Sequence, residues 1–210
     1  MKILRTLILA SLPAAASLSA AALTPREAFI KAPAEIIETI DSITRLDMLD
    51  YYDSGSTVSS RNAFGGDASV KSANDTSITV STSNVAEVTL VPLATNRRDS
   101  VLLVINTLAL PAPDSYAVSY DRNWHLDPKL SLPDHNNLDL WLMPSGRDVR
   151  DKIENAVPFI SAIYTYTNDT LTMTQTLSKL IPADDYKFVK PYLRPSISFV
   201  WNGKNWKQVK

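Results

Sequence analysis

The sequence contains no cysteine and only two histidines among its 210 residues. Without cysteine the chain cannot form disulfides, zinc–thiolate sites, iron–sulfur clusters or a thiol nucleophile. Neither sign of charge is in excess, because 21 Lys and Arg residues nearly balance 22 Asp and Glu residues, for a formal net charge of −1. No long basic run is present, and nothing in this balance attracts nucleic acid.

The motifs of the common enzyme classes are also missing. The sequence has no Gly-x-Ser-x-Gly, no His-Glu-x-x-His, no Walker loop and no Gly-x-Gly-x-x-Gly. We therefore expect no cofactor and no resident metal ion. These absences favour a non-enzymatic protein over an enzyme.

Residues 1–22 have the three parts of a secretory signal peptide. A charged start with Lys2 and Arg5 precedes an apolar run (7–12), and small residues suited to signal peptidase follow (17–22). The apolar run is shorter than the roughly 18–20 residues that span a bilayer. No cysteine is available for lipid attachment. We expect an exported protein, periplasmic or extracellular, not lipid-anchored, and without a membrane span after cleavage.

Two helices are predicted directly after the signal peptide. Thr-Pro-Arg-Glu at residues 24–27 has the sequence of a capping box. A second helix is indicated by Ile36, Ile37, Ile40 and Ile43, which recur on one helical face. An Asp-Ser-Gly-Ser sequence ends that helix at residues 53–56.

From residue 68 to residue 120 the apolar period is two, which predicts a meander of four or five antiparallel strands. Val101–Leu108 is apolar on both faces, as is typical of a central strand. An irregular, proline-rich section follows. Beyond it we expect two more strands (159–167 and 170–177), a helix starting at Pro182 and a C-terminal hairpin.

The predicted fold class is α+β, with N-terminal helices on an antiparallel β-sheet, followed by a second helix-plus-antiparallel-sheet portion. The proposed division is a signal peptide (1–22), a helix plus β-meander portion (23–130) and a helix plus β-hairpin portion (131–210). Two separate halves and one continuous domain both agree with this pattern.

The C-terminal hairpin turns at Asn202-Gly203, a pair typical of two-residue type I′ turns. Such a turn places Trp201 opposite Lys204 and Phe199 opposite Trp206. Tryptophans on a sheet can stack on sugar rings, but in hairpins they more often pair across strands or cover the core. We therefore predict a structural role for this pair.

Three carboxylates recur at every third position, as Asp47, Asp50 and Asp53, with Tyr51 and Tyr52 between them. On a helix they share one face, where without a basic partner they repel one another and suit a calcium ion or a general acid. A solvated helix end with capping aspartates explains the same pattern, and we favour it.

The two histidines, His125 and His135, lie in the irregular section with several aspartates near them in sequence. Together they suggest a His/Asp metal site. A spacing of ten residues fixes no geometry, so exposed loop residues without a special role are the simpler interpretation.

Several segments taken in order resemble a family of exported proteins of unknown function from Bacteroidales. The resemblance implies a Gram-negative envelope setting, and it brings no activity or site. The segments are residues 32–37, 44–55, 62–66, 190–197 and 201–204.

Our leading hypothesis is a non-enzymatic module that binds a macromolecule, either an unknown protein or a glycan of the cell envelope. A carboxylate-based hydrolase acting on glycan and a sugar-binding module are the alternatives. A deep pocket with converging Asp or Glu favours the enzyme, and a flat exposed row of Trp or Tyr favours sugar binding. An open strand edge or a large apolar patch favours a protein partner.

Overall fold

The computed structural model describes residues 23–96, 100–109 and 112–209. The predicted signal peptide lies outside these ranges. The described helices are α1 (Pro25–Lys31), α2 (Ser42–Asp53), α3 (Leu138–Trp141), α4 (Arg150–Ala156) and α5 (Ala183–Val189), with the 3₁₀ turns η1 (Pro128–Leu130), η2 (Pro144–Val149), η3 (Leu177–Lys179) and η4 (Lys190–Tyr192).

The described strands form two antiparallel sheets. The first sheet contains, in chain order, β1 (Ser60–Arg61), β2 (Asp67–Ala73), β3 (Ile78–Ser81), β4 (Ala86–Ala94), β5 (Ser100–Leu108) and β6 (Asp114–Tyr120). The second has the order β10-β9-β8-β7, built from β7 (Ala162–Thr167), β8 (Thr170–Gln175), β9 (Ser196–Trp201) and β10 (Trp206–Gln208). The predicted α+β class is confirmed, and the meander gains the short strand β1.

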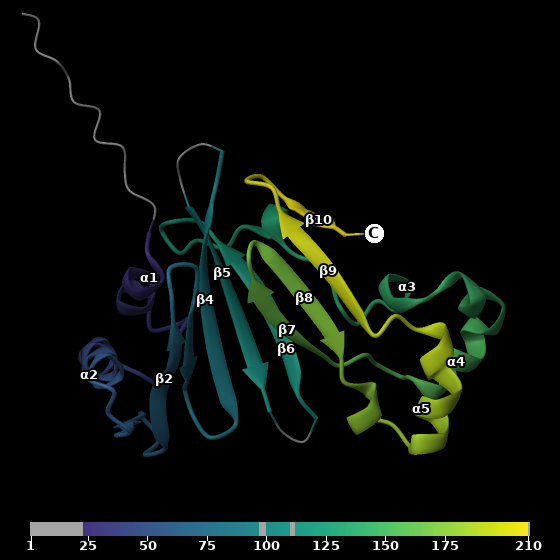
Figure 1. Cartoon of the computed structure of the whole chain (residues 1–210), viewed down its shortest axis with the longest axis horizontal. Coiled ribbons are helices and arrows are strands. Elements are labelled where there is room, and N and C mark those ends of the chain that lie inside the picture. The colour runs from purple at the N-terminus through teal and green to yellow at the C-terminus, as the bar shows by residue number, and fades with distance from the viewer. Residues whose placement is uncertain (1–22, 97–99, 110–111, 210) are drawn as a thin grey trace, which may run out of the picture.

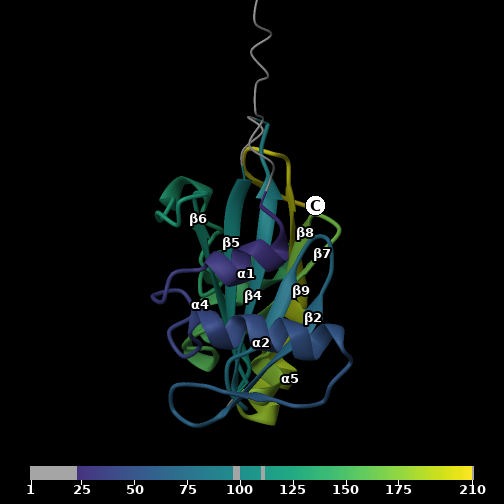
Figure 2. The same cartoon turned by 90° about the vertical axis from the view of Figure 1, so that its left-hand side faces the viewer.

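The first sheet is buried on both faces at its centre. Alternate residues of β4 and β5, among them Leu90 and Leu102, pack against α1 and α2. The residues between them, among them Val91 and Leu103, pack in a second core with β7–β9 and α3–α5. Figure 1 shows this order from left to right, and Figure 2 shows α1 and α2 lying across the strands. One core therefore draws on both halves of the chain, and the boundary near residue 130 stays a prediction.

The two sheets meet along a seam between β6 and β7. There the backbone N–H groups of Ala162 and Tyr164 donate to the side chains of Asp114 (2.9 Å) and Ser115 (3.2 Å). The hydroxyl groups of Ser161 and Thr176 donate to the carbonyl of Pro113 at 2.7 and 2.9 Å. Side chains, instead of a backbone ladder, thus join these two edges.

The helix predicted from Ile36 is wrong in its first part. Residues 34–40 form turns, and α2 begins only at Ser42, where the side chain of Asp41 accepts a hydrogen bond from the N–H of Thr44 (2.8 Å). Ile37 and Ile40 are buried from these turns, whereas Ile43 is 72% exposed. The apolar spacing therefore identified two buried positions, Ile37 and Ile40, but neither a helix nor a wholly buried face. The predicted end at Asp53 and the capping box of α1 are confirmed.

None of the helices in the described ranges is both long and apolar enough to cross a membrane.

Candidate functional site

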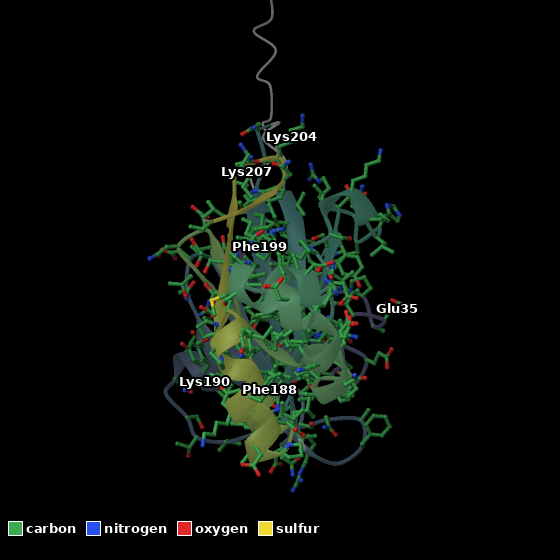
Figure 3. All side chains as sticks on the ribbon, turned by 90° about the vertical axis from the view of Figure 1, so that its right-hand side faces the viewer. Glu35, Phe188, Lys190, Phe199, Lys204 and Lys207 are labelled. Carbon is green, nitrogen blue, oxygen red and sulfur yellow. The ribbon has the colours of Figure 1, made fainter. Side chains whose placement is uncertain are left out.

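A cleft of about 610 Å³ opens at the end of the molecule that carries the C-terminal hairpin. Three segments far apart in sequence form its walls: the chain after β4, the segment from β6 to η1, and the loop between β9 and β10. Figure 3 shows Lys204 at this end of the molecule, with Lys207 beside it on the hairpin and Lys190 at the other end. The lining residues are Thr95, Asn96, Val101, Asp121, Asp127, Lys129, Leu130, Trp201, Gly203, Lys204 and Asn205.

The hairpin wall differs from its predicted geometry. Trp201 pairs with Trp206 and Phe199 with Gln208, so the loop contains four residues instead of two. The side chain of Asn202 closes this loop, because its Oδ1 accepts hydrogen bonds from the N–H groups of residues 204 (3.0 Å) and 205 (2.9 Å). This local cap competes successfully with a type I′ turn.

A two-residue turn of the predicted kind occurs instead between β7 and β8. Thr167 pairs with Thr170, and both intervening residues, Asn168 and Asp169, have positive φ (49° and 58°). Positive φ at both central positions is the requirement of a type I′ turn.

The tryptophans do not form a platform. Trp201 is only 7% exposed, and its indole N–H donates to the carbonyl of Ala94 (2.6 Å). Its ring is tilted by 57° against that of Trp206, with centroids 5.4 Å apart. Trp141 is fully buried, and Trp124 packs on Tyr120 at a tilt of 51°. The predicted structural role of the hairpin pair agrees with this packing.

Gly203 fixes the hairpin loop against the chain after β4. Its φ is +84°, and a Cβ there would lie 2.3 Å from Oδ1 of Asn96. The N–H of Asn96 donates to the carbonyl of Gly203 at 3.0 Å. The backbone angle therefore favours glycine, and a side chain at this position would also displace the side chain of Asn96.

The wall formed by the segment from β6 to η1 carries the carboxylates of the cleft. It begins with a loop that Asp121 organises through hydrogen bonds. Its Oδ1 accepts hydrogen bonds from the N–H groups of Asn123 (2.8 Å) and His125 (2.9 Å), and its Oδ2 lies 3.2 Å from Nδ1 of His125. Partial burial works to raise the pKa of the Asp121 carboxyl, but these hydrogen bonds outweigh it and hold the pKa below its ordinary value. His125 thus lies beside the cleft, exposed, as the partner of a carboxylate.

Asp127 and Lys129 follow on the same wall. Oδ1 of Asp127 accepts a hydrogen bond from the N–H of Lys129 (3.1 Å) and so caps η1. Among the described residues, neither the ammonium group of Lys129 nor that of Lys204 has an ion-pair partner within 4.0 Å. The cleft therefore holds two cationic groups whose charges the described fold leaves unpaired.

His135 lies elsewhere, inside the seam between the sheets. Its Nδ1 is 2.8 Å from the hydroxyl of Tyr164, and its Nε2 is 3.3 Å from Oδ1 of Asp114. Burial, with smaller contributions from Asp114 and Asp134, raises the pKa of the Tyr164 phenol. The two histidines therefore do not meet, and His135 serves to join β6, β7 and the irregular section.

The carboxylate row on α2 is also not a cluster. Asp53 forms a bidentate ion pair with Arg26 of α1 (2.6 and 2.8 Å), a basic partner that the sequence pattern did not indicate. The hydroxyl of Tyr52 accepts from the N–H of Ala73 at 3.2 Å. Asp47, Asp50 and Tyr51 are exposed. Within the described ranges, no group of three or more His, Asp or Glu is placed to hold a metal ion.

A second hollow, of about 500 Å³, lies beside the turns before α2. Arg45 lines it and is only 3% exposed. Its guanidinium donates to the carbonyls of Ile40 (3.0 Å), Phe29 (3.2 Å), Ile37 (3.2 Å) and, by a shorter contact, Ala32. This buried cation is held by carbonyls at the end of α1 and in the following turns, and its hydrogen bonds to Ile37 and Ile40 stabilise those turns.

The residues that line the cleft were largely missed by sequence reasoning. Asn96, Lys129, Lys204 and Asn205 belong to no motif, because the fold alone brings their segments together. The one available signal for this cleft was the glycine of Asn202-Gly203, but it indicated a hairpin turn and not that the turn lines a cleft.

Comparisons with known proteins agree with this fold. A family model described as "Protein of unknown function (DUF3256)" matches residues 17–206. The structure of a domain of an uncharacterized protein from Porphyromonas gingivalis W83 is similar, with a TM-score of 0.73 and 19% identity over 88% of this chain and 96% of that one. No curated protein shows significant similarity to the sequence. At this identity the structural likeness concerns the fold alone.

Proposed function

We propose that this chain, which belongs to the DUF3256 family, is a non-enzymatic binding module that holds a macromolecule in the cleft between its three loop walls. The observation that carries the proposal is the pair of unpaired ammonium groups, Lys129 and Lys204, in one cleft. Both lysines are exposed, so their charges are available to a ligand that enters the cleft.

A carboxylate-based hydrolase is the second candidate, and one observation favours it: Asp121 and Asp127 line the same cleft. A general acid needs a raised pKa, whereas the hydrogen bonds to Asp121 lower its pKa. Asp127 is likewise engaged as a helix cap. Binding without turnover agrees better with these two carboxylates.

Affinity electrophoresis tests the proposal. The protein is run through native gels containing dextran, polygalacturonate or poly-glutamate, with Lys129→Trp to obstruct the cleft and Lys190→Trp as the matched control at the other end of the molecule. We expect at least one polymer to retard the wild type and the control, but not Lys129→Trp. No retardation by any of the three, or equal retardation of both variants, contradicts a binding cleft.

The same incubations distinguish the two candidates. A binding module leaves the polymers intact, so no new reducing ends or free amines accumulate. Their release by the wild type, and its loss in Asp121→Asn, supports the hydrolase instead.

The proposal places this module in the bacterial envelope, on the strength of the signal-peptide pattern in residues 1–22. Mass spectrometry of the mature protein is expected to show a chain that starts near Leu23. An intact Met1 in the envelope fraction contradicts export with cleavage.

A further inference from the structure

The free polar groups of the cleft are mostly hydrogen-bond donors. Besides the ammonium groups of Lys129 and Lys204, the amide NH₂ of Asn205 has no partner among the described residues, since only its Oδ1 is engaged, by Asn202 (2.8 Å). A lysine ammonium offers three donors and no acceptor. An occupant rich in acceptors and carrying negative charge satisfies these groups best.

The carboxylates of the cleft limit which anionic occupants fit. Asp121 uses both oxygens within its own loop, and Asp127 uses one oxygen for the cap of η1. The other oxygen of Asp127 remains an acceptor. The carboxylate side chains of an acidic peptide only accept hydrogen bonds, whereas a sugar hydroxyl can donate to this oxygen and accept from a neighbouring amide, because a hydroxyl does both.

Most of the exposed lining of the cleft is apolar. Val101, Leu130 and the exposed edge of Trp201 contribute to this apolar lining, and Trp201 is committed to Ala94 through its indole N–H. Peptide binding by strand addition needs a longer free edge than β10, which has three residues. Recognition by side chains on the walls, and not by strand addition, is therefore the mode that this cleft supports.

We infer that the cleft binds an acidic saccharide, whose carboxylate or phosphate is bound by Lys129 and Lys204 and whose hydroxyls are bound by Asp127 and Asn205. This inference rests on the proposed function, and it adds the chemical class of the ligand.

Affinity electrophoresis with single substitutions tests the lysines. Lys129→Ala and Lys204→Ala are each expected to weaken binding to polygalacturonate by about tenfold, as for the loss of a charge-assisted hydrogen bond. Lys190→Ala is the matched control and leaves binding unchanged. Lys129→Arg and Lys204→Arg keep most of the affinity because they keep the charge. Circular dichroism melting of each variant shows whether the fold is preserved.

The choice of polymer separates the outcomes. Polygalacturonate is expected to bind more tightly than dextran, with an advantage that shrinks as salt is added. Equal binding of dextran overturns the acidic ligand and leaves the binding cleft standing. Stronger binding of poly-glutamate replaces the saccharide with an acidic peptide. If Lys129→Trp abolishes polygalacturonate binding but neither alanine variant weakens it, the lysines are not the recognition groups.

Discussion

Two hollows of similar size, about 500 and 610 Å³, show how differently one fold uses its cations. In the hollow beside α2, four of the five N–H groups of the Arg45 guanidinium donate to backbone carbonyls. In the cleft at the hairpin end, the ammonium groups of Lys129 and Lys204 have no anionic partner among the residues described. A cationic side chain in a hollow therefore indicates a ligand only where other groups of the fold do not already bind it.

Arg45→Met is the strongest test of this difference. The substitution keeps much of the apolar stem but leaves four carbonyls without their donor. We expect a loss of about 3–5 kcal/mol in the free energy of unfolding, since several buried acceptors become unsatisfied together. Urea denaturation measures it, with Arg147→Met, at an exposed position outside this hollow, as the control. A loss below about 1 kcal/mol contradicts the structural role of Arg45.

Gly203→Val tests how tightly the walls of the cleft are joined. Valine must adopt a φ of +84° and meets Asn96, so we expect a loss of about 2–4 kcal/mol. Repeating the substitution in an Asn96→Gly background removes the contact but keeps the unfavourable φ. Thermal melting should therefore show partial recovery. Full recovery excludes backbone strain as a cause of the destabilisation. An unchanged melting temperature for Gly203→Val itself contradicts the described loop, in which residue 203 has a positive φ and lies against Asn96.

The two tryptophans of the hairpin provide a matched pair with a smaller effect. Trp201→Phe loses the hydrogen bond to Ala94, and we expect it to cost about 1–3 kcal/mol. The indole N–H of Trp206 is buried without a partner among the described residues, so Trp206→Phe is expected to be nearly neutral. Denaturant titration of both variants checks the order. The reverse order indicates that a ligand or water binds the Trp206 N–H.

The smallest expected effect is on the stability of the fold at low pH, and it involves Asp53 on α2 and Asp121 in the cleft. The ion pair with Arg26 lowers the pKa of Asp53, and the pKa of Asp121 is lowered as well. Because these folded-state pKa values lie below the unfolded ones, their stabilisation is complete above about pH 4 and is lost as the pH falls further. Unfolding measured against pH should decline below about pH 4, and less steeply in Asp53→Asn. An identical slope in that variant contradicts a role for the ion pair.

Local patterns predicted the strands well and the sites poorly. The two-faced apolarity of Val101–Leu108 identified the central strand, because burial on both faces leaves a direct signature in sequence. The turns before α2 were mistaken for a helix, because Arg45 stabilises them through carbonyls that have no sequence signature. The hairpin register was missed because the side chain of Asn202 competes with the expected turn.

The candidate site was predictable only in fragments. His125 and the carboxylates near it were noticed, but Lys204 and the amides of Asn96 and Asn205 come from segments about 30 to 80 residues away, and only the tertiary fold joins them. The carboxylates of α2 have the spacing of a cluster on one helical face. Asp53, however, pairs with Arg26, which lies on another helix and gave no local signal in the sequence.

The seam between β6 and β7 also shows how two strand edges of this fold are covered. Exposed strand edges invite pairing between molecules, and natural sheets shorten, cover or block them. Here the facing edges of the two sheets satisfy one another through Asp114, Ser115 and Pro113. The outer edges in the described part of the chain are β1 and β10, with two and three residues. These two strands thus offer neighbouring copies very little backbone on which to add a strand.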